Sequence, residues 1–414
     1  MNLAVLSLIV FMITVVIGIL RKVNCGLAAI LASFILILFF IPDMDLADLY
    51  GRGWPVSTFF MMLSVLLLFG IAGANGTMEI VAKRMLTLAK GRASLMPFIV
   101  YFLSFLLSAS GAGPGVTPMI MMIAMGVCKE TGLSCFMMGI IVEIGAASGG
   151  LSPVATSGII AKELAAEVGV YDYMELFLPY AVAMFAEVLV VYFLFGGAKV
   201  KTVTAKNLRQ SIPQMNLHQK ETLAVILLVI SGIIFWGLDV SVTAFSGAAL
   251  LILLGVMEDK KAVSAVNWNT LLLVAGMYML ITVVDQCGGI ALISDILLKW
   301  ITPKSATGIM TLISGLLATV TSSSGVVMPT LIPVGGHIAE SLAGVSAASL
   351  LSGVIAGANC ALFCPFSVLG SMTIALYPEE INRQLIEKRH LQMTAASIVF
   401  FTLLGFSGFL SLLI

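Results

Sequence analysis

Short segments rich in small residues and proline interrupt the apolar runs of this 414-residue chain, and each occurs twice. SGAGPGVTP at 110–118 corresponds to TSSSGVVMP at 321–329, and IGAASGGLSP at 144–153 corresponds to AGANCALFCP at 356–365. The two pairs are separated by almost the same length of chain, which is about half of the sequence. Broken helices at membrane depth are tolerated where they line a cavity. The duplicated breaks therefore predict a transporter built from two repeats.

The composition indicates an all-α integral membrane protein. Hydrophobic residues make up 60% of the chain and charged residues 10%, against roughly 25% charged residues in soluble domains. The apolar runs are long enough to cross a bilayer as helices. The zero net charge gives no basic surface for nucleic acid, so the expected partner is the lipid bilayer. The six cysteines are scattered, and we predict no cofactor and no transition metal.

Apolar windows divide the chain into repeat 1 (1–205), a cytoplasmic linker (206–220) and repeat 2 (221–414). Each repeat is predicted to have five transmembrane helices plus one re-entrant hairpin, and a charged, amphipathic helix in the membrane interface at 77–92 or 288–303. The hairpins are placed at 94–128 and 305–342, and the spans at 3–20, 25–41, 56–73, 133–158, 174–195, 221–238, 240–257, 268–284, 345–376 and 393–413.

Basic residues predict the orientation, because cytoplasmic loops collect Lys and Arg. An odd number of crossings in each repeat inverts the second repeat relative to the first. Only four of the 21 basic residues then fall on one side, namely Arg52, Lys162, Lys299 and Lys304. That side is predicted to be outside, with both chain termini on it, and the location to be the inner or plasma membrane. The run at 3–20 lacks a positive leader and is interpreted as a span.

The four breaks are predicted to expose helix ends to one cavity. Helix N-termini suit carboxylate oxygens, whereas carbonyl and hydroxyl oxygens suit a hard cation such as Na⁺. No Lys or Arg lies near the centre of a predicted span, so a bound anion would need helix ends and a co-transported cation to balance its charge. The predicted substrate contacts are Ser110, Gly111, Ala112, Thr117, Ser152, Thr156, Ser322, Ser323, Ser324, Asn359 and Pro365. The predicted cation ligands are Ser108, Ser110, Gly145, Ser148, Gly149, Thr321, Ser322, Gly357 and Asn359.

Other interpretations of these polar residues stay open. Any one serine or threonine can bond back to its own helix instead of binding a ligand. Glu143 lies at membrane depth, where ionisable groups are expensive, and is predicted either to titrate in proton coupling or to bond backbone N–H groups. Glu187 is interpreted as structural and His337 as a boundary histidine, with a proton shuttle as the alternative for His337. His390 is assigned to a basic cytoplasmic stretch without a role.

These features together resemble the divalent-anion/sodium symporter group of the ion transporter superfamily. SGAGPGVTP at 110–118 is similar to the bacterial dicarboxylate/malonate carrier branch. The Ser-Asn-Thr signature of that family's hairpin tips falls on 110–112 and 322–324, where this chain has neither the Asn nor a Thr in third place. The resemblance implies a homodimer and an elevator mechanism, with scaffold spans within 3–73 and 221–284 and transport elements within 94–195 and 305–413.

The leading hypothesis is a secondary active transporter that moves a small di- or tricarboxylate with Na⁺ as the coupling ion and H⁺ as the second choice. A Na⁺/H⁺ antiporter on a related scaffold is the alternative, because Glu143 lies at membrane depth. An intramembrane hydrolase would need a nucleophile and a base, and the sequence offers only Ser322, Ser323 or Ser324 with His337. We therefore predict no enzymatic activity.

Overall fold

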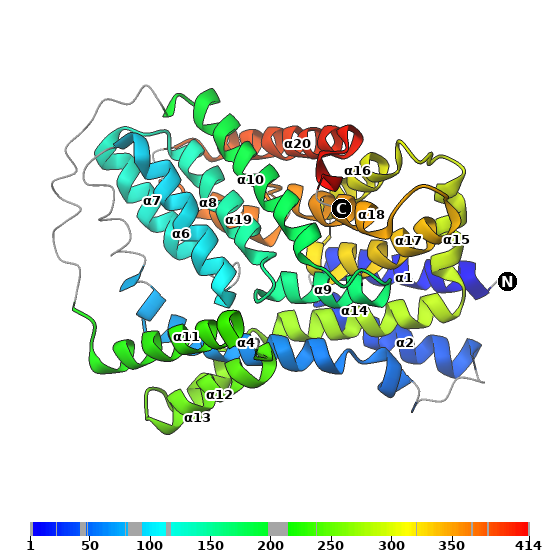
Figure 1. Ribbon diagram of the computed structural model, residues 1–414, viewed down its shortest axis with the longest axis horizontal. Coiled ribbons are helices and arrows are strands. Elements are labelled where there is room, and N and C mark those ends of the chain that lie inside the picture. The colour runs from blue at the N-terminus through cyan, green and yellow to red at the C-terminus, as the bar shows by residue number, and fades with distance from the viewer. Residues whose placement is uncertain are drawn as a thin grey trace.

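The computed structural model describes residues 3–21, 23–41, 47, 49–78, 80–81, 93–112, 117–197, 214–236, 238–319, 321–365, 367–378 and 381–412. These residues form helices joined by turns, without a strand among them (Figure 1). The all-α prediction is thus confirmed. Within the described ranges, five helical segments are long and apolar enough to cross a membrane, at 56–74, 93–111, 174–194, 268–286 and 383–407.

The helices of the two halves follow one another in the same order. The first half contains α1 (Leu3–Arg21), α2 (Cys25–Phe40), η1 (Leu49–Gly53), α4 (Val56–Ala74), η3 (Ala93–Leu95), α6 (Met96–Leu107), η4 (Ser108–Ala112), α7 (Thr117–Thr131), α8 (Cys135–Gly150), α9 (Thr156–Glu167) and α10 (Met174–Leu194). The second half contains α11 (Leu217–Trp236), α12 (Val240–Leu253), α13 (Asp259–Ser264), α14 (Trp268–Gln286), α15 (Gly289–Leu298), α16 (Ala306–Ala318), η8 (Ser323–Val327), α17 (Met328–Ser341), α18 (Ala347–Cys360), α19 (Val368–Ala375), α20 (Arg383–Ser407) and η9 (Phe409–Ser411).

Side-chain caps fix where several helices begin. Ser134 accepts a hydrogen bond from the Met137 amide at the start of α8, and Ser346 accepts one from the Ser349 amide at the start of α18. Asn24, Asp239 and Asn267 cap α2, α12 and α14 in the same way. Each cap satisfies an N–H group that has no partner within its helix.

The helices form two groups (Figure 1). One group runs along the lower side of the view and includes α2, α4, α11, α12 and α14; the other lies above it and includes α6–α8, α10, α16, α18 and α20. In the lower group α2 packs on α14 and α4 packs on α12, so the second long helix of each half contacts the third long helix of the other. In the upper group α8 packs on α6 and α7, and α18 packs on α16 and α17. The division into scaffold and transport parts stays a prediction.

Glycines allow the closest contact in the lower group. A Cβ atom added to Gly26 would lie 2.0 Å from the Leu272 carbonyl oxygen, and one added to Gly276 would lie 2.1 Å from the Gly26 carbonyl oxygen. The backbones of α2 and α14 therefore touch, which is the packing that small residues provide between membrane helices. The two halves are joined here through their backbones.

Several predicted boundaries differ from the structure. The spans predicted at 133–158 and 345–376, each with an unwound stretch, correspond to α8 and α9 and to α18 and α19, and the helices of each pair are separated by a break. The last span begins at Arg383 and not near 393, because Asn382 caps α20 and accepts from the Leu385 amide. The interfacial helix predicted at 288–303 is the shorter α15, and most of the one predicted at 77–92 lies outside the described residues. So does 206–213 of the linker, whose last residues already belong to α11.

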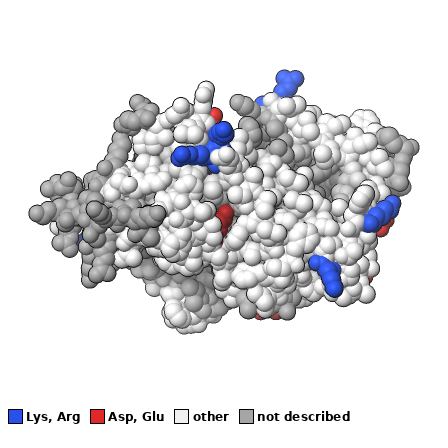
Figure 2. All heavy atoms as spheres, turned by 90° about the horizontal axis from the view of Figure 1, so that it is seen from above, with Lys and Arg blue, Asp and Glu red and all other residues white. Residues whose placement is uncertain are grey.

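Charged side chains are few on the face seen in Figure 2: Lys and Arg appear at a few separate places, and an acidic side chain lies near the middle of the view. Large apolar side chains are exposed along α20, the helix that Figure 1 shows on this side: Leu391, Val399, Leu403 and Phe406. Apolar side chains exposed along the length of a helix are expected where lipid replaces water.

Candidate functional site

The first hairpin, hairpin 1, consists of α6, η4 and α7, and the turn after α8 at 151–155 is break 1. One hydrogen bond joins hairpin 1 to α8, and another joins it to break 1. Ser108 Oγ donates to the Ala146 carbonyl oxygen at 2.7 Å, and Ser152 Oγ donates to the Ala109 carbonyl oxygen at 2.6 Å. Hairpin 1 is thus the donor in the bond to α8 and the acceptor in the bond from break 1.

The second half repeats this pattern. Hairpin 2 consists of α16, η8 and α17, and the segment after α18 at 361–365 is break 2. Ser323 Oγ donates to the Ala358 carbonyl oxygen, and Cys364 Sγ donates to the Thr319 carbonyl oxygen at 3.3 Å. Ala358 and Cys364 occupy the positions in the second sequence repeat that Ala146 and Ser152 occupy in the first.

Glycines hold each helix against its hairpin. A Cβ atom on Gly145 would lie 2.6 Å from the Tyr101 carbonyl oxygen of α6, and one on Gly357 would lie 2.2 Å from the Thr311 carbonyl oxygen of α16. Gly357 again stands at the position of Gly145 in the repeat. These glycines therefore serve close backbone packing in both halves.

The breaks lie later than predicted. Helix α8 continues through Gly145, Ser148 and Gly149 to Gly150, and α18 continues through Gly357 to Cys360. Because a helical carbonyl bonds the amide four residues on, the Gly145 carbonyl is used within α8 and is no longer a candidate cation ligand. Carbonyls in the last turn of a helix lack such partners. Ser148, Gly149 and Gly357 lie in those last turns.

The remaining predicted residues of the first half lie at the tip of hairpin 1 or at helix starts. Ser110 Oγ bonds back to the Leu107 carbonyl oxygen at 2.9 Å, and Gly111 adopts a positive φ of 108° where its Cα faces Val65 and Phe69 of α4. Ala112 ends η4. Thr117 and Thr156 begin α7 and α9; both are buried, and the Thr117 hydroxyl has no hydrogen-bond partner.

In the second half, Ser322 accepts from the Gly325 amide at 3.1 Å and so caps η8. Thr321 and Asn359 bond back to their own helices, to the carbonyl oxygens of Leu317 and Ile355. Ser324 and Pro365 are half-buried at the tip of hairpin 2 and in break 2. Of the serines at the two tips, Ser108 and Ser323 bond across to the neighbouring helix, which spacing alone did not distinguish.

Contact between the halves of the candidate site runs through α9. This helix follows break 1 and packs on η8, α17 and α18 of the second half, and on α4 of the lower group. The C-terminal end of α9 lies beside hairpin 2, where a Cβ atom on Gly336 would lie 2.6 Å from Val168, and the N-terminus of α9 follows break 1. A helix N-terminus presents free N–H groups and partial positive charge.

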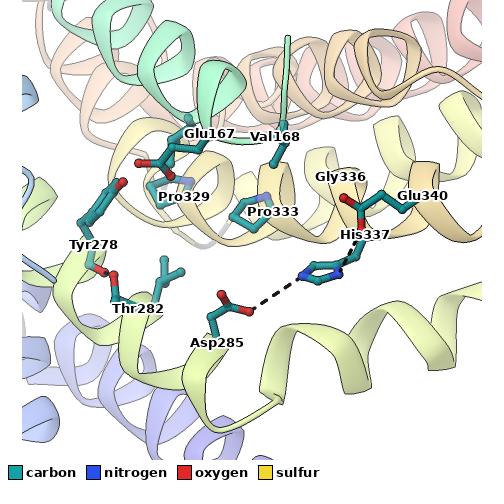
Figure 3. A pocket seen from close by; sticks show the side chains of 12 residues that line it. Glu167, Val168, Tyr278, Thr282, Asp285, Pro329, Pro333, Gly336, His337 and Glu340 are labelled. Carbon is teal, nitrogen blue, oxygen red and sulfur yellow. Dashed lines mark hydrogen bonds and ion pairs between the residues drawn. The ribbon is translucent and has the colours of Figure 1, made fainter. Parts of the chain in front are cut away.

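A cavity of about 370 Å³ opens between α9, α14 and α17 (Figure 3). Its wall runs along hairpin 2 from Pro329 through Pro333 to Glu340, and along α14 from Tyr278 to Asp285. Pro329 is one turn beyond Gly325, and a Cβ on Gly325 would lie 2.7 Å from the side chain of Leu273 on α14. The tip of hairpin 2 is thus pressed on α14 next to one end of the cavity.

Titratable side chains gather in the cavity wall. His337 Nε2 lies 3.9 Å from Asp285 Oδ1, and His337 Nδ1 lies 4.0 Å from Glu340 Oε2, so the histidine faces two acids (Figure 3). Glu167, at the end of α9, lies beyond the predicted span. Burial raises the pKa of its carboxyl to about 7, and the nearby charge of Glu163 adds to the rise.

Glu143 is fully buried in α8, and neither carboxyl oxygen has a hydrogen-bond partner. The structural role predicted for it, bonding to backbone N–H groups, is therefore wrong. Its Oε2 atom lies 3.9 Å from Nδ1 of His390, which is also fully buried. His390 does not belong to a cytoplasmic loop, because α20 starts at Arg383 and carries the histidine into the core. Only the helix start at Asn382 would have indicated this from the sequence.

Glu187 is the other buried acid of the described segments, in α10, with Oε2 unpartnered. His337 is half-exposed on hairpin 2 and faces Asp285 and Glu340, with no hydrogen bond to a serine among the described contacts. The serine and histidine required for a hydrolase are thus not paired.

Comparisons with known proteins fit this arrangement. Residues 8–357 and 225–412 match the citrate transporter family, CitMHS. The YdaH transporter of Alcanivorax borkumensis has a similar structure, with a TM-score of 0.63 at 13% identity over 87% of this chain and 87% of that one. MtrF of Neisseria gonorrhoeae, described as illuminating a class of antimetabolite efflux pumps, matches with a TM-score of 0.58 at 15% identity over 90% of this chain and 85% of that one.

The fold and its paired hairpins and breaks define a multi-pass membrane transporter and not an enzyme. Because the family match covers most of the sequence, the chain belongs to the citrate transporter (CitMHS) family of the ion transporter superfamily. Its assignment to the divalent-anion/sodium symporter group and the malonate-like branch stays a prediction.

Proposed function

We propose that this protein is a secondary active transporter that carries citrate, or a closely related di- or tricarboxylate, together with Na⁺. The observation that carries the proposal is the family match combined with two helix breaks, each tied to a hairpin tip. The resemblance to divalent-anion/sodium symporters supports the same class of substrate. H⁺ is the second choice of coupling ion.

The proposed carboxylate contacts lie at helix starts. N–H groups are available in the first turn of α9 and at the start of η8, which continues into α17. The side chains of Thr156, Ser322 and Ser324 lie at these helix starts. Ser152 and Pro365 mark the two breaks, and Asn359 lies in the last turn of α18. No Lys or Arg lies among these residues, so the anion's charge is balanced by helix ends and by the cation.

The proposed Na⁺ ligands lie at helix ends. The Gly149 carbonyl accepts from the Ser152 amide at 2.9 Å and the Gly357 carbonyl accepts from Cys360 Sγ at 3.0 Å, and each oxygen keeps a second lone pair for a cation. Hydroxyls of Ser108 and Ser148 lie beside the first of these ends, and Thr321 lies beside the second half's tip. Neutral oxygen ligands favour a hard cation over a transition metal.

Uptake into proteoliposomes tests the proposal. We expect labelled citrate to accumulate when an inward Na⁺ gradient is imposed, and to accumulate less when choline replaces Na⁺. Succinate, malate and malonate are added as competitors to rank the carboxylates. Absence of carboxylate uptake under a Na⁺ gradient, a pH gradient and both together would contradict the proposed class of substrate.

A Na⁺/H⁺ antiporter remains the second candidate because Glu143 is buried without a hydrogen-bond partner. It predicts Na⁺-driven proton movement without any carboxylate. A pH-sensitive dye inside the same vesicles distinguishes the two: a Na⁺ pulse alone changes the signal of an antiporter, whereas the symporter needs citrate as well.

The inverted repeats, the outside termini, the homodimer and the elevator movement belong to the same proposal. Each break donates a side-chain bond to its hairpin from an equivalent position, Ser152 or Cys364, and this recurrence supports the duplication. Membrane-impermeant labelling of single cysteines placed near each terminus tests the orientation, and cross-linking in native membranes tests the dimer.

A further inference from the structure

The carboxyl of Glu143 lies in an environment that does not support a lone negative charge. The residue is 0% exposed, and neither of its oxygens accepts a hydrogen bond. Thr373 lies beside the carboxyl, but its hydroxyl makes no hydrogen bond either. An ionised carboxylate in the interior needs a partner, or else it binds a proton. Within the described residues, His390 is the basic group found within 4.0 Å.

His390 is held by two further contacts. Its Nδ1 atom lies 3.1 Å from the Phe363 carbonyl oxygen, and its Nε2 atom lies 3.2 Å from the Tyr377 hydroxyl. Because a carbonyl only accepts, Nδ1 carries a hydrogen in either charge state of the ring. Phe363 belongs to break 2, so the imidazole connects Glu143 of the first half to the break of the second half.

The Tyr377 hydroxyl lets the cluster accept one more proton without losing a hydrogen bond. When the imidazole is neutral, the hydroxyl donates to the bare Nε2 atom. When the imidazole is charged, Nε2–H donates to the hydroxyl oxygen, and the hydroxyl hydrogen turns to the Phe136 carbonyl oxygen, 3.4 Å away. Both arrangements use contacts that the structure already has. The cluster is therefore built for two protonation states.

Three other titratable side chains lie near this cluster. A Cβ on Gly139 would lie 2.1 Å from the Tyr377 hydroxyl, so this glycine makes the space for it on α8. From α20, the guanidinium of Arg389 lies 5.7 Å from the ring centroid of Phe136, whose ring also stands edge-on to His390. Two thiols, Cys128 on α7 and Cys135 on α8, are the other titratable groups near Tyr377.

We propose that Glu143 and His390 together bind one proton during the transport cycle. The change in their protonation state is transmitted to break 2 through the His390–Phe363 contact. The proton adds to the carboxylate or to Nε2 from water and leaves to water, so no other reactant is needed. This inference rests on the proposed function and names the residues through which a pH gradient would act on it.

The test compares net accumulation with exchange in proteoliposomes. Accumulation of labelled citrate driven by a pH gradient needs proton binding and release, whereas exchange of external for internal citrate does not. We expect Glu143→Gln and His390→Gln to lose the response to the pH gradient while citrate exchange persists. Glu187→Gln is the matched control, because it neutralises the other buried acid, and it should keep both activities.

Three outcomes would overturn the inference. The first is a Glu143→Gln protein that responds to the pH gradient as the wild type does. The second is a Glu187→Gln protein that loses the same response, because the effect would then belong to any buried acid. The third concerns the wild type and applies even if the variants do not fold. In weakly buffered detergent solution, the protein would bind citrate without taking up or releasing a proton. A wild type without carboxylate transport contradicts the proposed function instead.

Discussion

The two halves place different side chains in the same position. Ser152 in break 1 bonds to hairpin 1 through an O–H···O contact of 2.6 Å, whereas Cys364 in break 2 reaches hairpin 2 through an S–H···O contact of 3.3 Å. A thiol is a weak donor and a hydroxyl is a strong one. The backbone approach is nevertheless kept by Gly145 and Gly357. Close glycine packing is thus common to both halves, while the side-chain bond that closes each break differs in strength.

Disrupting the glycine packing that both halves share should have the largest effect on stability. Gly357→Ala places a Cβ 2.2 Å from the Thr311 carbonyl oxygen, and Gly145→Ala places one 2.6 Å from the Tyr101 carbonyl oxygen. Because backbone cannot move aside cheaply, we expect a loss of stability of about 1–3 kcal/mol or more for each, greater for Gly357→Ala. Thermal unfolding of the purified protein, followed by tryptophan fluorescence, measures the difference.

Gly126→Ala is the control for these variants. Gly126 lies in α7, and no atom comes within 4 Å of the position that an added Cβ would take. Alanine is favoured over glycine in a helix by about 1 kcal/mol, so this variant should be as stable as the wild type or slightly more so. Equal stability of Gly126→Ala and Gly357→Ala would show that the contact between α16 and α18 is looser than the structure has it.

Removing the side-chain bond of a break should cost different amounts of stability in the two halves. Ser152→Ala leaves the Ala109 carbonyl without its donor and should cost about 0.5–1.5 kcal/mol, the usual contribution of one hydrogen bond. Cys364→Ala removes the weaker donor and should cost less. Cys364→Ser should restore a bond of the first half's kind and slow any opening of break 2. Melting temperatures of the three variants give the order, and a larger loss for Cys364→Ala than for Ser152→Ala would reverse the comparison.

The cavity lies between α9 of the first half and α14 and α17 of the second, and Glu167 in its wall predicts a pH effect. Its pKa of about 7 means that the carboxyl gains its negative charge as the pH rises through neutrality. The charge appears in the wall of the cavity that Asp285 and Glu340 also line, so an anion that enters through this cavity should enter more slowly over this range. Glu167→Gln should flatten that part of the dependence. The ratio of variant to wild-type citrate uptake at each pH cancels the titration of citrate itself, and a ratio that stays constant with pH would contradict the assignment.

The sequence was sufficient for the features that local chemistry determines. Proline and small residues located the hairpin tips, and the breaks followed within a few residues, because Pro153 and Pro365 remove backbone donors. The sequence was not sufficient where tertiary contacts determine the local structure. Glycines at 145 and 149 indicated a point of unwinding, but they pack α8 on α6 and keep it helical.

His390 shows the same limit more clearly. The charged residues at 383–389 resemble a loop, so the sequence places the histidine in solution. Its partners, the Phe363 carbonyl and the Tyr377 hydroxyl, lie 27 and 13 residues away in the chain. Likewise, spacing did not reveal that Ser108 and Ser323 bond across to another helix while Ser110 and Thr321 bond to their own. Partner choice at this distance depends on helix packing, which periodicity does not encode.

The smallest expected effect is at the ion pair between hairpin 2 and α14. His337 and Asp285 are 3.9 Å apart, and their side chains are 45% and 53% exposed. Exposed pairs contribute about 0–1 kcal/mol, because water screens them and two side chains must be ordered. Asp285→Asn should therefore change the melting temperature less than Ser152→Ala does, and Glu340→Gln, which removes the other acid beside His337, should change it as little. A destabilisation by Asp285→Asn that exceeds that of Ser152→Ala would mean that this pair, and not the tip packed on Leu273, holds hairpin 2 against α14.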